Sequence, residues 1–255
     1  MSDPAANDQA ALVTGAGKRL GRAFAEALAQ DGWFVWVHYN TSRAEAGETV
    51  AAIRAKGGRA RAVKADLSHA RQTEALVGKC AAGPDLTLLV NNASLFELDR
   101  PQDFTLEGWD RHQAVNLRAP AILARDFARS LPGKRTGLIV NLLDQKLWNL
   151  NPDFYSYTVA KIGLQGMTEI LARAYAPRIR VCGIAPGITL PAARQSREKF
   201  LAAQARAPLG LGSTPADLVR TLRFILATPS LTGHTIVVDG GEHLGKRPND
   251  VMFET

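Results

Sequence analysis

Two kinds of segment alternate along this chain of 255 residues, and that alternation limits the fold more than any other feature of the sequence. Short apolar or β-branched runs of strand length are followed by longer stretches with apolar residues three and four apart, the spacing of a helix face. Strands that alternate with helices form a parallel sheet joined by crossover helices. The sequence therefore predicts one α/β domain over 1–255, with a Rossmann-like, doubly wound parallel sheet of seven strands and helices on both faces.

The expected elements follow from these runs. Strands are expected at Ala10 to Thr14, Phe34 to Tyr39, Ala60 to Ala65, Leu86 to Val90, Gly137 to Leu143, Arg178 to Ile184 and Thr235 to Val238. Helices are expected near Leu20 to Gln30, Arg43 to Lys56, Arg71 to Lys79, Glu107 to Leu131, Tyr155 to Ala176 and Pro215 to Ala227. Residues 1–9 are expected to be a flexible lead. Residues 186–213 are expected either to cover a substrate or to form an ordinary helical excursion.

Composition excludes several classes of function. Hydrophobic residues make up 46% and charged residues 22% of the chain, as in a typical globular protein. The longest apolar runs are too short to span a membrane and Met1 to Gln9 has no apolar signal core, so we expect a cytoplasmic protein without a membrane partner. The net charge of +7 is scattered along the chain, which argues against nucleic acid. Cys80 and Cys182 lack metal-ligand spacing, so no metal site is expected.

A glycine-rich turn follows the first predicted strand. It reads Thr14-Gly15-Ala16-Gly17-Lys18-Arg19-Leu20-Gly21 and leads into an amphipathic helix. Glycines there let the backbone approach a pyrophosphate, which the N–H groups at the start of the following helix can hold. The spacing differs from the common GxGxxG fingerprint and is by itself a weak signal. Its place between a strand and a helix favours dinucleotide binding.

The end of the second strand indicates which dinucleotide is bound. An Asp or Glu there would bind the ribose 2′-hydroxyl of NAD, but the chain reads His38-Tyr39-Asn40-Thr41-Ser42-Arg43, with no acid. Hydroxyls and a guanidinium can receive a 2′-phosphate, and Lys18 adds a second cation. Ser42 could equally cap the helix that starts at Arg43. The pattern favours NADP(H) over NAD.

Two further strand ends carry polar residues. Asp66-Leu67 follows the third strand, where the carboxylate could accept from the adenine amino group or could cap a helix; the two readings are equal on sequence. Asn91-Asn92-Ala93-Ser94 follows the fourth strand. It places small polar groups at the carboxyl edge of the sheet, where open α/β folds bind ligands.

The residues with chemical potential lie in the second half of the chain. Tyr157 and Lys161 are four apart on one predicted helix, so their side chains share a face. A lone Tyr-x-x-x-Lys occurs by chance in many helices. Here Asp144 lies thirteen residues before Tyr157, at the end of a strand, and Asn116 lies in the preceding long helix.

In order and spacing, these pieces resemble the short-chain dehydrogenase/reductase family over essentially the whole chain. The matching pieces are the glycine turn, Asp66, Asn91-Asn92-Ala93, Asn116, Tyr157-x-x-x-Lys161, Pro186-Gly187 and Val238-Asp239-Gly240-Gly241. The resemblance implies that Tyr157 is the general acid/base, that Lys161 binds the nicotinamide ribose and lowers the pKa of Tyr157, and that Asn116 supports a relay water. It also implies a homotetramer in which Lys246 to Thr255 could reach a neighbouring subunit's pocket.

Two departures from the family pattern narrow the expectation. Arg19 stands where the turn usually has Gly, and Asp144 replaces the catalytic Ser; both resemble the pteridine reductase and dihydromonapterin reductase branch. An ionised carboxylate only accepts hydrogen bonds, so Asp144 suits a substrate that offers N–H donors, such as a 2-amino-4-oxopteridine. Phe96 would stack on a flat pterin, and Arg19 could lie near the cofactor phosphates and the polar edge of the substrate.

The first hypothesis is therefore NADPH-dependent reduction of a pterin-like C=N bond in a small molecule. The expected catalytic residues are Tyr157, Lys161, Asp144 and Asn116; the expected substrate contacts are Arg19, Phe96, Asp144 and Tyr157; and the expected cofactor contacts are Gly15, Lys18, Arg19, Leu20, His38, Tyr39, Asn40, Ser42, Asp66, Leu67, Asn92, Ala93, Ser94, Lys161, Pro186 and Gly187. One alternative is a carbonyl reductase or alcohol dehydrogenase acting on a sugar, a ketoacyl thioester or a similar carbonyl compound. Another is a non-catalytic NADP(H) sensor, which has no need of Tyr157, Lys161 and Asn116 together.

Overall fold

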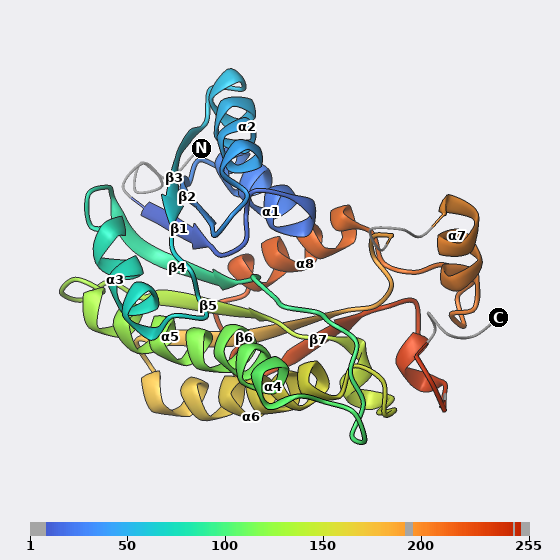
Figure 1. Ribbon diagram of the computed structural model, residues 1–255. Coiled ribbons are helices and arrows are strands. Elements are labelled where there is room, and N and C mark those ends of the chain that lie inside the picture. The colour runs from blue at the N-terminus through green and yellow to red at the C-terminus, as the bar shows by residue number, and fades with distance from the viewer. Residues whose placement is uncertain (1–8, 192–195, 247, 251–255) are drawn as a thin grey trace.

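One parallel sheet forms the centre of the molecule in the computed structural model, which describes residues 9–191, 196–246 and 248–250 (Figure 1). In this part of the chain the sheet has seven strands in the order β3-β2-β1-β4-β5-β6-β7, and each neighbouring pair is parallel. The strands are β1 (Gln9–Val13), β2 (Phe34–Tyr39), β3 (Arg59–Lys64), β4 (Asp85–Asn91), β5 (Gly137–Leu142), β6 (Ile179–Pro186) and β7 (Thr235–Val238). The predicted fold class is confirmed.

Helices cover both faces of the sheet (Figure 1). They are α1 (Arg19–Gln30), α2 (Arg43–Ala55), α3 (Ala70–Cys80), α4 (Leu106–Gln113), α5 (Ala119–Ser130), α6 (Tyr155–Tyr175), α7 (Arg197–Ala205) and α8 (Pro215–Ala227). The helices α1, α2 and α8 pack on one face, and α3, α5 and α6 pack on the other. The helix α7 lies apart from these layers, beyond one end of the sheet and close to the described end of the chain (Figure 1).

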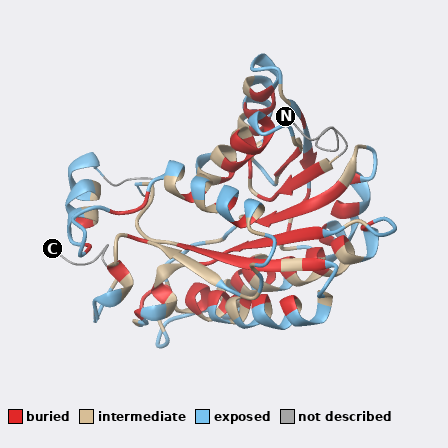
Figure 2. Cartoon of the chain, turned by 180° about the vertical axis from the view of Figure 1, so that it is seen from behind, coloured by how far each residue is buried: buried red, intermediate tan, exposed pale blue. Residues whose placement is uncertain are grey.

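The core consists of two apolar layers, one on each side of the sheet. Phe24 and Leu28 of α1 belong to one layer, and Leu123 and Phe127 of α5 belong to the other. All six residues of β5 are buried, as expected for a central parallel strand that is covered on both faces. Figure 2 shows the same distribution, with buried strands inside and the exposed sides of the helices outside. Each fully buried side chain of this size contributes roughly 1.5–3 kcal/mol, so the layers hold the strand ends firmly in place.

The predicted helix Glu107 to Leu131 is interrupted in the structure. It is divided into α4, the π-helical segment η2 (Ala114–Arg118) and α5. Pro120 supplies a reason, because it has no N–H to donate to the carbonyl four residues earlier, which belongs to Asn116. The N–H of Ala119 instead bonds to the carbonyl of Ala114, five residues back. The irregular turn therefore falls on the residue expected to take part in catalysis.

Several expected segments fall partly outside the described residues. Gln9 belongs to β1 and not to a lead, and residues 1–8 of the expected lead lie outside the description. So do residues 192–195 of the 186–213 region and residues 247 and 251–255 of the C-terminal segment. Among the helices that are described, none has the length and apolar character needed to cross a membrane.

The strand order places a ligand site at the carboxyl ends of β1 and β4. From β1 the chain builds the sheet outward through β2 and β3, and then crosses back to continue on the other side with β4. The connections after β1 and β4 therefore lead to opposite sides, which leaves a crevice between them at the edge of the sheet. The glycine turn follows β1 and the Asn91-Asn92-Ala93 segment ends β4, so both predicted binding segments lie at this point.

Candidate active site

The glycine turn between β1 and α1 has a backbone shape that few residues adopt. Gly15 and Arg19 have positive φ angles of 63° and 55°. A Cβ on Gly15 would lie 3.0 Å from the Cα of Ala93, and one on Gly21 would lie 2.3 Å from the carbonyl oxygen of Gly15. Glycine at these two positions therefore allows the close backbone approach that a pyrophosphate site needs.

His38, near the end of β2, holds this turn in place. Its buried ring accepts the Gly15 N–H at Nδ1 over 3.0 Å, and Nε2 lies 3.1 Å from the carbonyl oxygen of Ala65. These partners assign the proton to Nε2, since the N–H can only donate and the carbonyl can only accept. Burial lowers the pKa of His38 to about 4, so the ring is neutral near pH 7. His38 lines the cofactor cavity as predicted, but both ring nitrogens bind the protein.

The ends of β1 and β4 are tied together by Thr14, which the sequence analysis did not single out. Its hydroxyl accepts the N–H groups of Asn92 and Ala93, each over 2.9 Å. The side-chain amide of Asn92 in turn donates to the Thr14 carbonyl over 2.8 Å. Asn92 therefore shapes the crevice through its bonds to Thr14.

A cavity of about 560 Å³ opens at this crevice. The predicted cofactor residues that line it are Gly15, Lys18, Arg19, Leu20, His38, Tyr39, Asn40, Ser42, Asp66, Leu67, Asn92, Ala93 and Ser94. Gly17, Gly21, Thr41, Leu95 and Val115 also line it and were not among the predicted cofactor contacts. The helix α1 begins at Arg19, so its first N–H groups lie at the wall of the cavity, where a helix N-terminus favours an anion.

The rim of this cavity beside β2 carries hydroxyl and amide groups. Asn40, Thr41 and Ser42 line it there. Ser42 occupies the position before α2, yet within the described residues its side chain makes no capping hydrogen bond. Of the two sequence readings for Ser42, the structure therefore does not support the cap, and a role for its hydroxyl in ligand binding remains.

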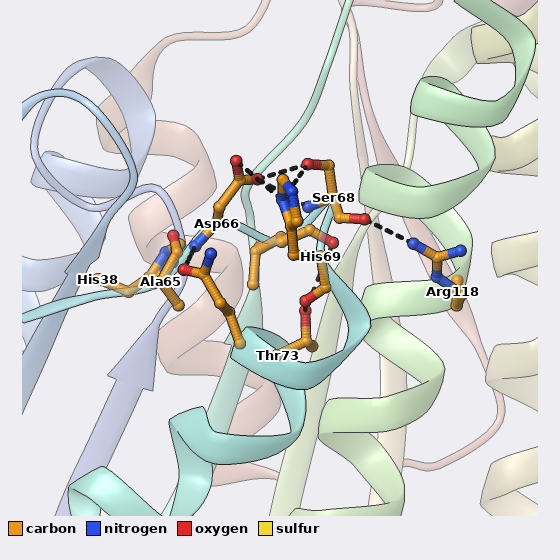
Figure 3. Close-up of polar contacts among 9 residues, drawn as sticks. His38, Ala65, Asp66, Ser68, His69, Thr73 and Arg118 are labelled. Atoms are coloured by element: carbon orange, nitrogen blue, oxygen red, sulfur yellow. Dashed lines mark hydrogen bonds and ion pairs between the residues drawn. The ribbon is translucent and has the colours of Figure 1, made fainter. Parts of the chain in front are cut away.

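Asp66 takes part in a local network at the start of α3 (Figure 3). Its Oδ1 accepts from the N–H and the hydroxyl of Ser68 over 2.9 and 2.7 Å, and its Oδ2 lies 3.2 Å from Nδ1 of His69. Arg118 donates to the Ser68 carbonyl over 2.6 Å, which connects this corner to η2. Asp66 thus organises the chain before α3 and lines the cavity, but it does not cap α3, whose N-cap residue is His69; of the two sequence readings, the structure supports the one in which Asp66 faces a ligand.

A second cavity of about 420 Å³ adjoins the first. Arg19, Leu20, Asn92 and Ser94 line both cavities, so the two are continuous. The other predicted residues that line the second cavity are Phe96, Asp144, Tyr157, Lys161, Pro186 and Gly187. Ile188, Thr189, Leu190 and Ala203 line it too, so both 186–190 and α7 contribute to its walls, which favours the substrate-covering reading of this region.

Tyr157, on the first turn of α6, forms a hydrogen-bonded pair with Asp144. The tyrosine hydroxyl donates to Oδ2 of Asp144 over 2.7 Å. Oδ1 of the same carboxylate accepts the N–H of Lys146 over 2.9 Å at the start of the short helix η3 (Gln145–Trp148). Lys161 Nζ donates to the Leu142 carbonyl and lies 5.5 Å from the centroid of the Tyr157 ring. Three of the four residues predicted to be catalytic, Tyr157, Lys161 and Asp144, therefore lie together.

The electrostatics of Tyr157 differ from the expectation. Burial and then the negative charge of Asp144 raise the pKa of Tyr157 well above its usual value, whereas the resemblance implied that Lys161 lowers it. Burial also raises the pKa of Asp144 and lowers that of Lys161 to about 8, although Asp144 opposes the latter shift. The reason for the correction is that a carboxylate, where the family usually has a neutral hydroxyl, favours the protonated phenol. These effects favour the protonated form of Tyr157 over the phenolate.

Phe96 forms an aromatic wall of the second cavity. Its side chain remains 46% exposed, stacks on Phe154 with 4.0 Å between ring centroids, and meets Tyr157 edge-on at 4.7 Å. This places an apolar surface directly beside the Tyr157 ring. A flat ring system can lie against such a surface.

Asn116 lies in η2 and does not line either cavity. Its side-chain amide bonds to the backbone of Leu95 at both ends: Oδ1 accepts the N–H and Nδ2 donates to the carbonyl, each over 2.8 Å. Asn116 therefore positions the chain just before Phe96. Single-turn π segments are frequent at functional sites, and the relay-water role stays a prediction.

Three charged residues of the second cavity region were missed by the sequence analysis. Lys146 is 4% exposed, Glu242 is buried, and Asp250 lines the cavity and binds Lys146. Each lies outside the recognised motifs, and only the proximity of Lys146 to Asp144 could have drawn attention to it. The resemblance allowed the C-terminal segment to reach a neighbouring subunit's pocket, but the described Asp250 lies at the cavity of its own chain.

Comparison with known proteins agrees with this geometry. A solved structure of FolM alternative dihydrofolate reductase 1 from Brucella canis, complexed with NADP, is 41% identical, covers 96% of this chain and 98% of its own, and has a TM-score of 0.91. The angucycline C-6 ketoreductase LanV with bound NADP is 32% identical, with 93% and 96% covered and a TM-score of 0.84. A 3-oxoacyl-acyl-carrier-protein reductase from Synechocystis is 31% identical over 91% of this chain and 96% of the relative.

A family model and the relatives described above together show the family. The family model described as short chain dehydrogenase matches residues 9–202, which is most of the chain. The NADP in the solved relatives agrees with the cofactor expected from the end of β2. With the glycine turn, the Tyr157 and Lys161 pair and the sheet order all in place, this chain belongs to the short chain dehydrogenase family.

Proposed function

We propose that this protein is an NADPH-dependent reductase that reduces a C=N bond of a pterin-like small molecule. The observation that carries the proposal is the partly buried pair in which the Tyr157 hydroxyl donates to the carboxylate of Asp144. Reduction of a C=N bond adds a hydride to carbon and a proton to nitrogen. A phenol with a raised pKa is in the protonated form that this reaction needs.

The charge of Asp144 favours a nitrogen substrate over a simple ketone. When a carbonyl is reduced, negative charge develops on its oxygen, and a nearby carboxylate opposes that charge. A 2-amino-4-oxopteridine instead presents N–H groups, for which a carboxylate is the matching acceptor. Asp144 can therefore orient both the Tyr157 hydroxyl and the polar edge of such a substrate.

The walls of the second cavity support the same substrate class. Phe96 offers an aromatic surface next to the Tyr157 ring, and Arg19 lines both cavities. The likeness to the alternative dihydrofolate reductase from Brucella canis, a protein named for a pterin-containing substrate, supports the proposal.

The cofactor is proposed to be NADPH, held by the first cavity with its 2′-phosphate near Ser42 and Lys18. The glycine turn fits a pyrophosphate, since a Cβ at Gly15 would fill the space where the backbone approaches Ala93. Bound NADPH supplies the hydride. Lys161, which lies near Tyr157, would hold the nicotinamide ribose, as in the family pattern. The second cavity would hold the substrate next to the nicotinamide.

A second candidate is a carbonyl reductase. The ketoreductase LanV and the Synechocystis relative share the fold and a large part of the sequence. This candidate requires Asp144 to be protonated during turnover, so that it can donate to a carbonyl oxygen. The raised pKa of Asp144 gives that state some support.

The test follows NADPH oxidation by absorbance with dihydrobiopterin, dihydromonapterin or dihydrofolate, against a panel of ketones and aldehydes. Turnover of a pterin is expected, and Tyr157→Phe is expected to lower kcat about a thousandfold because the proton donor is lost. Binding of NADP+ should be unchanged in this variant, which serves as the control for folding. Turnover of carbonyl compounds without turnover of any pterin would move the assignment to the second candidate.

A further inference from the structure

Asp250, the last residue that the structure describes, lies at the second cavity. Its side chain lines the second cavity together with Asp144 and Tyr157. Oδ2 of Asp250 accepts from Lys146 Nζ over 2.9 Å, and the backbone N–H of Asp250 donates to Asp153 over 2.8 Å. Asp250 is therefore held at both its side chain and its backbone.

Asp153, which accepts the backbone N–H of Asp250, is itself held in place by a second partner. Asp153 is fully buried, and its Oδ1 accepts from Arg100 Nε over 2.7 Å. The same carboxylate group thus binds the loop after β4 on one side and the C-terminal segment on the other. Asp250 is fixed relative to the start of α6, where Tyr157 lies.

Lys146 connects Asp250 to the catalytic pair. Its backbone N–H donates to Oδ1 of Asp144, and its ammonium group bonds to Asp250 while lying 5.3 Å from the centroid of the Phe154 ring. The Lys146 side chain is almost completely buried. A buried ammonium that loses its carboxylate partner is strongly disfavoured, so the position of Lys146 depends on Asp250.

We propose that Asp250 is a positioning residue of the active site: by holding Lys146, it fixes the carboxylate of Asp144 against the Tyr157 hydroxyl. The C-terminal segment is then part of the proton-donating machinery of its own chain. The inference rests on the proposed function only in taking Tyr157 as the proton donor, and it holds whichever small molecule is reduced.

The charges around Tyr157 predict in which direction the pKa of Tyr157 should shift when one of them is removed. Asp144 and Asp250 disfavour the phenolate, and both contribute to the raised pKa of Tyr157 after the effect of burial. Lys146 and Lys161 are the cations of the same region, and both lie close enough to Asp144 to act on its carboxylate. Removing Asp250 or Lys146 should therefore shift the titration of Tyr157 in opposite directions.

The first experiment needs no turnover. Tyrosinate absorbance is followed against pH for the protein saturated with NADP+, and Tyr157→Phe identifies the signal of Tyr157. In Asp250→Asn the signal should move to lower pH by roughly half a unit or more, and in Lys146→Met it should move to higher pH by a similar amount. The double variant should lie between the two.

The matched control is Asp31→Asn, which removes the same charge from an ion pair with Arg223 between α1 and α8, away from the two cavities. It should leave the Tyr157 signal in place. Unchanged NADP+ affinity shows that a variant is folded, and Asp250→Glu, which retains the carboxylate, should recover most of the native titration.

The second experiment separates positioning from substrate contact. With whichever substrate is turned over, Asp250→Asn should lower kcat about tenfold and change KM less than threefold, because the proton donor and not substrate binding is disturbed. The Asp250→Asn and Lys146→Met effects on kcat should not add in the double variant, since both act through the same link.

The inference is overturned if Asp250→Asn titrates and turns over like Asp31→Asn. It is also overturned if the variant raises KM with kcat unchanged, which would make Asp250 a substrate contact. Failure of pterin turnover would remove the proposed substrate but would leave the tyrosinate result to decide the role of Asp250.

Discussion

The two cavities of this protein are built by different means. The first is formed by backbone: the left-handed Gly15, the start of α1, and strand ends tied by Thr14 and the neutral ring of His38. The second is formed around charged side chains: the partly buried Asp144 accepts from the Tyr157 hydroxyl, and the buried Lys146 and Lys161 act on Asp144. A cofactor shared by many relatives can be held by main-chain geometry, whereas the identity of a substrate depends on individual charged side chains.

The largest effect expected for this comparison is on the free energy of unfolding, and it tests whether the first cavity depends on a neutral His38. The folded-state pKa of His38, about 4, lies below the ordinary value of 6.5 because of burial, so the unfolded chain takes up a proton first as the pH falls. The stabilisation is complete above pH 6.5 and is lost as the pH falls toward 4. The free energy of unfolding should decrease by about 3 kcal/mol over this window.

Urea denaturation at a series of pH values measures this change. The control is His38→Asn, which can accept the Gly15 N–H but does not titrate, and its stability should vary less over the same range. If the free energy of unfolding changed equally with pH in both proteins, other groups would cause the pH dependence. The first cavity would then not depend on a neutral His38.

The next effect concerns the charge that distinguishes the second cavity. Asp144→Ser restores the hydroxyl that is usual in the family and removes the carboxylate that favours N–H donors. We expect kcat/KM for the pterin to fall about a hundredfold and carbonyl turnover to rise, because the serine can donate to a developing oxyanion. Steady-state assays with both substrate classes measure the ratio, and a variant that loses both activities equally would contradict the assigned role of Asp144.

The smallest effect sharpens the account of the first cavity. Asn40→Asp places a carboxylate at the end of β2, where it should repel the 2′-phosphate of NADPH and bind the 2′-hydroxyl of NADH. The preference for NADPH over NADH in kcat/KM should fall about tenfold. The control is Asn40→Ala, and if both variants change the preference equally, the charge is not the cause.

The sequence predicted the first cavity well because its residues follow strand ends within short, contiguous motifs. Thirteen of the sixteen predicted cofactor residues line it, and the remaining three, Lys161, Pro186 and Gly187, line the adjoining cavity. The seven strands were also found, since buried parallel strands form apolar runs. Around the first cavity, the local sequence pattern therefore predicts the tertiary structure.

The second cavity could be predicted only in part. Tyr157, Lys161 and Asp144 have a recognisable spacing, but the contact between Lys146 and Asp250 joins residues 104 positions apart. No local pattern reports such a contact. The family resemblance implied that Lys161 lowers the pKa of Tyr157. The sequence does not show that the Tyr157 side chain is buried and bonded to the carboxylate of Asp144, and both effects raise this pKa. The break in the helix at η2 could have been inferred from Pro120.

Arg19, Leu20, Asn92 and Ser94 form a wall common to both cavities, and this has a thermodynamic consequence. When a ligand in one cavity restrains these side chains, part of the ordering cost for a ligand in the other has already been met. The two affinities are then linked by a single coupling free energy, and the linkage is reciprocal: whatever factor the dinucleotide adds to the affinity for the second molecule, that molecule adds to the affinity for the dinucleotide.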